Sequence, residues 1–95
     1  MSNGGKEIVQ HATTSNTAAW NTLINNPQST GNPNAVLFET PNVDPGGVGA
    51  NATFDSAPTG VLYRLSPTDR SAVFHEDMST NIAIGASYNV LIFPS

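Results

Sequence analysis

The chain has 95 residues, which allow one small domain, and only 11% of them are charged. Three Lys and Arg against seven Asp and Glu give a net charge of −4, so neither nucleic acid nor an anionic membrane surface is an expected partner. Cysteine is absent, which excludes disulfide bonds and thiol catalysis. A core this small usually needs a further source of stability, and the sequence therefore predicts a homo-oligomer.

Short apolar segments between Pro and Gly residues predict an all-β architecture for residues 6–95, after a flexible stretch at residues 1–5. Lys6–Ala12 alternates in polarity and predicts the opening strand. Residues 17–24 fit two structures. Behind the N-cap candidates of Thr13–Asn16 their apolar side chains recur at helical spacing, whereas their β-branched residues favour a strand.

Later segments complete the predicted β structure. Ala35–Thr40 begins with a continuous apolar run and predicts a central strand buried on both faces, and Ala50–Phe54 predicts a short edge strand. Gly60–Leu65 and Ser71–Glu76 flank a turn that contains Pro and Asp, which predicts a hairpin. Gly85–Phe93 predicts the closing strand. Five to seven short strands predict a small antiparallel β-sandwich or barrel.

Five short sequence blocks stand out for their order and spacing. They are NPNAVLF at 32–38, TPNVDPGGVG at 40–49, GVLY at 60–63, VFHED at 73–77 and GASYNVL at 85–91. Together they resemble an uncharacterised β-rich domain of secreted bacterial proteins, whose blocks are similar to NPNA, TPNWNPGG, GVWY, IFNxD and GAxFNV. The resemblance extends over residues 8–93, nearly the whole chain.

This resemblance implies a β fold and a secreted or cell-surface setting, often within multidomain or tandem proteins, and it implies no established activity. The opening residues contain no apolar segment of a signal peptide. Val43, Leu62 and Ala72 stand at positions where the resemblance leads us to expect Trp. If the family uses those rings as a shared surface, this chain has lost much of it.

The densest group of titratable residues is His75-Glu76-Asp77. In a strand, His75 and Asp77 share one face and Glu76 the other, so the three cannot converge on one atom. A hydrolytic or metal role would need further ligands, for which the candidates are His11, Glu39 and Asp44. No nucleophile motif is present either, and the sequence predicts a protein that is not an enzyme.

Calcium is a second candidate, because the sequence offers oxygen ligands for it. The oxygen-rich segment Asn42–Asp44 could hold it together with Asp55, Asp69 or Asp77, although no EF-hand spacing is present. Asn and Asp next to Pro and Gly are more often turn formers. The prediction is therefore that no cofactor is bound, with calcium as the alternative.

The neutral polar composition fits a neutral glycan as ligand, because 30 of the 95 residues are Asn, Thr or Ser. Sugars are held by polar side chains and by aromatic rings stacked on their apolar face. The candidate ligand-binding residues are Trp20, Tyr63, Asn42, Asp44, His75 and Asp77, with Tyr88 as a further ring. Core packing is the competing interpretation of Trp20 and of the tyrosines.

The sequence thus predicts an extracellular, lectin-like carbohydrate-binding module without catalytic activity. The alternative is a structural or adhesive repeat domain that self-associates or packs on neighbouring domains.

Overall fold

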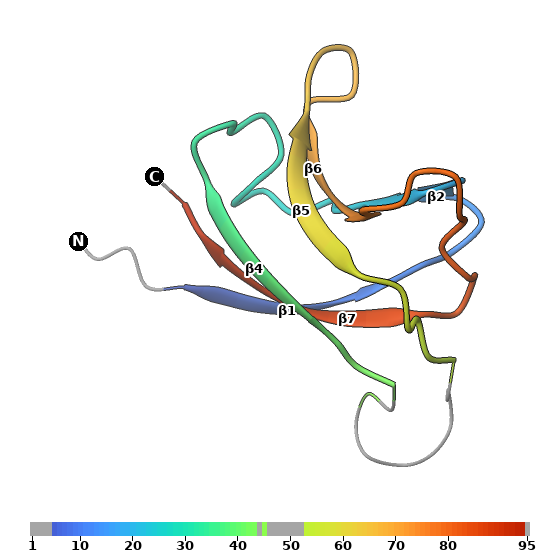
Figure 1. Cartoon of the computed structure of the whole chain (residues 1–95). Helices are drawn as coiled ribbons and strands as arrows, with labels where there is room; N and C mark the ends of the chain where they lie inside the picture. The colour runs from blue at the N-terminus through green and yellow to red at the C-terminus, as the bar shows by residue number, and fades with distance from the viewer. Residues whose placement is uncertain (1–4, 44, 46–52, 95) are drawn as a thin grey trace.

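Seven strands form two antiparallel sheets in the computed structural model, which describes residues 5–43, 45 and 53–94 (Figure 1). Sheet A has the strand order β1-β7-β4, and sheet B has the order β2-β3-β6-β5. The bounds are β1 Lys6–His11, β2 Thr17–Ala18, β3 Asn21–Leu23, β4 Val36–Pro41, β5 Thr59–Arg64, β6 Arg70–His75 and β7 Ser87–Phe93. The two sheets lie face to face, which confirms the predicted all-β sandwich (Figure 1).

The core lies between the sheets and is built largely on β7, the central strand of sheet A. Tyr88, Val90 and Ile92 occupy alternate positions of this strand and are all buried, whereas Asn89 between them is exposed. Val73 of β6 belongs to the same buried cluster from the opposite sheet. A period of two in polarity therefore places one face of β7 in the core and the other on the surface.

A chain of hydrogen bonds crosses from sheet A to sheet B at the β1 edge. Gln10 Nε2 donates to Thr22 Oγ1 at 3.0 Å and to the Leu23 carbonyl at 2.8 Å. Thr22 Oγ1 donates to Asn16 Oδ1 at 3.0 Å, and Asn16 Nδ2 donates to the His11 carbonyl at 2.8 Å. These bonds hold β1 of sheet A against β3 of sheet B without a disulfide.

Residues 17–24 form two short strands and a turn, so the structure decides for the strand and against the helix. Ala19 adopts a positive φ of 56°, which reverses the chain between β2 and β3. The side chain of Asn16 accepts a hydrogen bond from the Thr13 N–H at 2.8 Å, but here it stabilises a turn and no helix follows.

The strand predicted over 35–40 exists as β4, but its predicted central position is wrong. β4 pairs only with β7 and is an edge strand. Val36 and Phe38 are 52% and 60% exposed, because nothing among the described residues covers the outer face of sheet A. Of the strand predicted over 50–54, residues 50–52 lie outside the described residues and 53–54 are in no strand.

The opening strand, the hairpin and the closing strand are confirmed as β1, the β5–β6 pair and β7. β7 takes the central position that β4 was expected to hold. None of the described residues forms a helix that is long and apolar enough to cross a bilayer.

Candidate functional site

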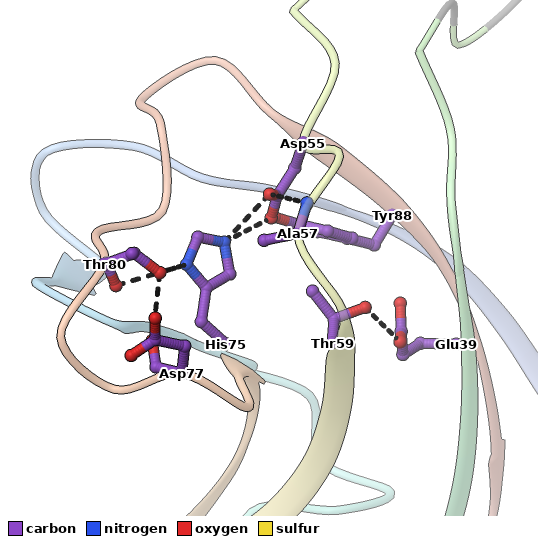
Figure 2. A network of polar contacts seen from close by, with 8 residues as sticks. All are labelled: Glu39, Asp55, Ala57, Thr59, His75, Asp77, Thr80 and Tyr88. Atoms are coloured by element: carbon purple, nitrogen blue, oxygen red, sulfur yellow. Dashed lines mark hydrogen bonds and ion pairs between the residues drawn. The ribbon is translucent and has the colours of Figure 1, made fainter.

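A buried polar network joins the end of β6 to β7 and to the segment before β5 (Figure 2). His75 is 3% exposed, and its Nε2 lies 2.9 and 2.8 Å from Oδ1 and Oδ2 of Asp55. Tyr88 donates its hydroxyl to Asp55 Oδ2, and the Ala57 N–H donates to Oδ1 at 3.2 Å. The carboxylate thereby ties residues 53–58 to both sheets.

The second ring nitrogen of His75 faces two oxygens of Thr80 (Figure 2). Nδ1 lies 2.9 Å from Thr80 Oγ1 and 3.2 Å from its carbonyl oxygen, and Oγ1 donates its own proton to the Asp77 carbonyl. Nδ1 is therefore the donor toward the Thr80 carbonyl, since a carbonyl oxygen can only accept. His75 and Asp55 form a buried pair in which Nε2 faces both carboxylate oxygens.

The succession of carboxylate, imidazole and hydroxyl in Asp55, His75 and Thr80 is the set of groups found in a nucleophile triad. Its chemistry is different here. A ring nitrogen that donates to the Thr80 carbonyl cannot accept the proton of Thr80 Oγ1, which is already donated to the Asp77 carbonyl. The geometry of the network is that of a buried, hydrogen-bonded ion pair.

Tyr88 supplies the donor on the sheet A side of this network. Burial, and after it the hydrogen bond to Asp55, raises the pKa of the Tyr88 hydroxyl far above its usual range. The phenol thus keeps its proton and remains a donor to the carboxylate. Asp55 accepts two strong side-chain donors, which compensates for its burial.

Glu39 on β4 lies near the network and is only partly compensated (Figure 2). Its Oε1 accepts a hydrogen bond from Thr59 Oγ1 at 2.7 Å, but its buried Oε2 has no partner among the described residues. Burial raises the pKa of Glu39, the Thr59 bond opposes this shift, and the charge of Asp55 adds to it. Glu39 is therefore a destabilising carboxylate at neutral pH.

The structure does not bring the sequence-predicted site residues together. Trp20 lies in the β2–β3 turn on the outer side of sheet B, edge-on to Phe74 at 6.2 Å, with the Arg64 guanidinium 5.8 Å from its ring centre. Tyr63 is half-buried on β5 opposite Ser71. Burial and the nearby Asp69 raise the pKa of Tyr63.

Of the remaining candidates, His75 is buried in the ion pair and Asp77 is exposed. Hydrogen bonds from the Ser79 hydroxyl and backbone N–H hold the pKa of Asp77 below its usual range. Asn42 donates to Asn89 Oδ1 at 2.8 Å, beside β7. Asp44 lies outside the described residues, so the structure does not test the calcium prediction; elsewhere in the described chain, no three His, Asp or Glu gather at one point.

An open groove of about 570 Å³ runs over the outer face of sheet A, and we call it the sheet A groove. Strand alternation directs six side chains outward along it, three apolar and three polar. They are Glu7, Val9, Phe38, Thr40, Asn89 and Leu91. All three strands contribute, so the groove exists only because β1 and β4 flank β7.

The outer face of sheet A changes from apolar to polar along the strands. At one end Phe93 lies opposite Val36, and the next row holds Phe38 and Leu91. Thr40 and Asn89 form the following row, beyond which the Asn42 N–H bonds the Ser87 carbonyl. The Phe38 ring is held edge-on to Phe93 at 6.2 Å and 84°. A ligand in the groove therefore meets a positioned ring on one side and amide and hydroxyl groups on the other.

Sequence reasoning missed the groove because it treated 35–40 as buried on both faces. One signal was available. In this segment, Leu37 and Glu39 alternate with Val36, Phe38 and Thr40, and the second set is the outward one.

The described residues define an antiparallel β-sandwich with a buried ion pair and one open sheet face. The family described as Domain of unknown function (DUF7452) matches residues 1–92, and the chain belongs to this family. No curated protein and no solved structure gives a significant match.

Proposed function

We propose that this protein is a non-catalytic, extracellular module that binds a neutral glycan in the sheet A groove. The observation that carries the proposal is the Phe38 ring, which is 60% exposed, fixed against Phe93 and followed on the same face by Thr40 and Asn89. A pyranose has an apolar C–H face and a rim of hydroxyl groups. An exposed ring beside amide and hydroxyl side chains complements both.

The size and charge of the groove support a small neutral ligand. Its volume of about 570 Å³ falls within the range of small-molecule sites, about 300–1,000 Å³. The side chains that point into the groove include one carboxylate, that of Glu7, and no Lys or Arg. Carboxylates accept hydrogen bonds from sugar hydroxyls but repel an anionic ligand.

The absence of catalysis is supported by the state of the one His–Asp pair among the described residues. His75 is buried, and both its nitrogens are engaged within the network, so neither is available to a substrate. The extracellular setting rests on the resemblance of the sequence blocks. The site differs from the predicted one, since only Asn42 of the six candidates reaches the groove, through Asn89.

A second function is favoured by the apolar end of the same face. Val36 and Phe93 are exposed there. Gly5 packs closely against this end, since a Cβ at Gly5 would lie 2.7 Å from a side-chain atom of Leu91 and 3.0 Å from one of Phe93. Exposed apolar patches on small domains often mark protein interfaces. A second copy of the chain would cover this end and compensate for the thin core.

A glycan array followed by titration of the best hit tests the first proposal. Phe38→Ala is expected to weaken binding by about tenfold, because a stacked ring contributes on the order of 1–2 kcal/mol. Phe54→Ala is the matched control, since Phe54 is 62% exposed and lies outside the groove. Addition of EDTA reveals whether binding needs calcium.

Light scattering on the same variants separates the two functions. If no glycan binds and the wild type is a dimer that Phe38→Ala converts to a monomer, the groove is a self-association surface and the glycan proposal is wrong. If Phe54→Ala abolishes glycan binding as fully as Phe38→Ala, the groove is not the site.

A further inference from the structure

A second cleft lies at the side of the sandwich, where β1 of sheet A meets β3 of sheet B, and has a volume of about 420 Å³. Its lining is polar and includes Gln10, His11, Asn25 and Arg70. We propose that this cleft binds a small carboxylate that also carries hydroxyl groups, such as an acidic sugar unit. The proposal does not depend on glycan binding in the sheet A groove.

Gln10 supplies a fixed acceptor to this cleft. The residue is 7% exposed, and its Nε2 is held by the Thr22 hydroxyl oxygen and the Leu23 carbonyl. Because a carbonyl can only accept, the amide cannot be flipped. Its Oε1 has no hydrogen-bond partner among the described residues. An acceptor that is held in one orientation and reaches the cleft can accept a hydrogen bond from a hydroxyl or N–H of a ligand.

Arg70 supplies a cation without a counterion. No carboxylate of the described residues lies within ion-pair distance of it, and no acidic residue lines the cleft. Arg64, directly opposite on β5, has its guanidinium over the Trp20 ring. In a chain with a net charge of −4, a cleft with an arginine and no carboxylate is an unusual local concentration of positive charge.

His11 and Asn25 complete the set of available polar groups. His11 uses Nδ1 toward Ser87 Oγ at 2.9 Å, and its Nε2 has no partner among residues that the structure describes. Asn25 is exposed, and no side-chain hydrogen bond of it is seen in the same residues. A planar guanidinium matches a carboxylate, and the neighbouring acceptor and amide groups match hydroxyls. The cleft therefore selects a hydroxylated carboxylate over a bare anion.

Backbone amide NMR with D-glucuronate tests the site, with D-glucose, acetate and inorganic phosphate as comparison probes. D-Glucuronate is expected to shift the amides around Gln10, Asn25 and Arg70, with a Kd of about 1 mM. Arg70→Gln should weaken this binding about tenfold. The matched control Arg64→Gln removes the neighbouring arginine and should change the Kd less than about twofold. Phe38→Ala should leave it unchanged.

Several outcomes would overturn the proposal. Equal binding of acetate or phosphate would show a general anion site without recognition of hydroxyls, and equal binding of D-glucose would show that Arg70 has no role. If Arg64→Gln weakens D-glucuronate binding as much as Arg70→Gln does, the loss comes from the β5–β6 hairpin as a whole and not from Arg70. No shift with D-glucuronate at about 10 mM would exclude the site. Loss of D-glucuronate binding in Phe38→Ala would place the ligand in the sheet A groove.

Discussion

The Asp55 carboxylate lies 2.8 Å from Nε2 of His75, and both side chains are more than nine-tenths buried. The two residues are 20 positions apart, one in the segment before β5 and the other at the end of β6. The pair thus connects an irregular segment to sheet B, and Tyr88 extends the connection to sheet A. Its contribution to stability can be measured directly.

Asp55→Asn is expected to destabilise the protein by about 3 kcal/mol, because an amide replaces the buried carboxylate that both His75 and Tyr88 contact. The substitution conserves volume, so the loss measures the change from carboxylate to amide and not a cavity. Urea denaturation at neutral pH measures it. Glu76→Gln, an exposed change next to His75, serves as the control and should stay within about 0.5 kcal/mol of the wild type. An equal effect of the two substitutions would contradict the ion pair.

Tyr88→Phe removes one donor to Asp55 and is expected to cost about 1–2 kcal/mol at neutral pH. It should also change the alkaline behaviour. The folded state raises the pKa of Tyr88 above the ordinary value of 10.0, so it retains a proton that the unfolded chain loses, and wild-type stability falls as the pH rises above that value. Tyr88→Phe should lose less stability between neutral pH and about pH 11. Parallel slopes for the two proteins would refute this assignment.

Glu39→Gln is expected to stabilise the protein at pH 7. Folding raises the pKa of Glu39 above the ordinary value of 4.5, so its favourable contribution is present below that pH and is lost as the pH rises. The amide still accepts from Thr59 and removes the charge that faces Asp55. The stability difference between variant and wild type should therefore grow from about pH 4 to pH 7, as followed by thermal unfolding. A difference that is independent of pH would be inconsistent with this origin.

Asn16→Ala is expected to cost about 2–4 kcal/mol, since one amide side chain makes four hydrogen bonds between the β1 end and sheet B. Its Oδ1 accepts from Thr13 N, Thr17 Oγ1 and Thr22 Oγ1, and its Nδ2 donates to the His11 carbonyl. Asn32→Ala is the matched control. The Asn32 side chain makes only two long local bonds, at 3.3 and 3.5 Å, and its loss should cost less than about 1 kcal/mol. Chemical denaturation of both variants decides the comparison.

The sequence alone was sufficient to predict β1, the β5–β6 hairpin and β7, and with them an all-β sandwich. These elements are specified locally. Each contains a short apolar segment of strand length, and Pro- and Gly-containing turns separate the segments. The same local signals left 17–24 undecided between helix and strand, because eight residues with β-branched and apolar side chains satisfy both patterns. In the structure, the positive φ at Ala19 turns the chain, so residues 17–24 form two short strands joined by a turn.

Only the tertiary structure decided which strand is central and which face is open. Alternation of polarity within a strand shows that its two faces differ, but it does not show whether another layer covers the outer face. Phe38 is exposed because no described residues cover the outer face of β4, which has only β7 as a neighbour. Likewise, the motif around His75 was visible in the sequence, whereas its partner Asp55 was not. The Asp55–His75 pair, the sheet A groove and the cleft between β1 and β3 all depend on segments brought together from distant positions in the sequence, which no local pattern encodes.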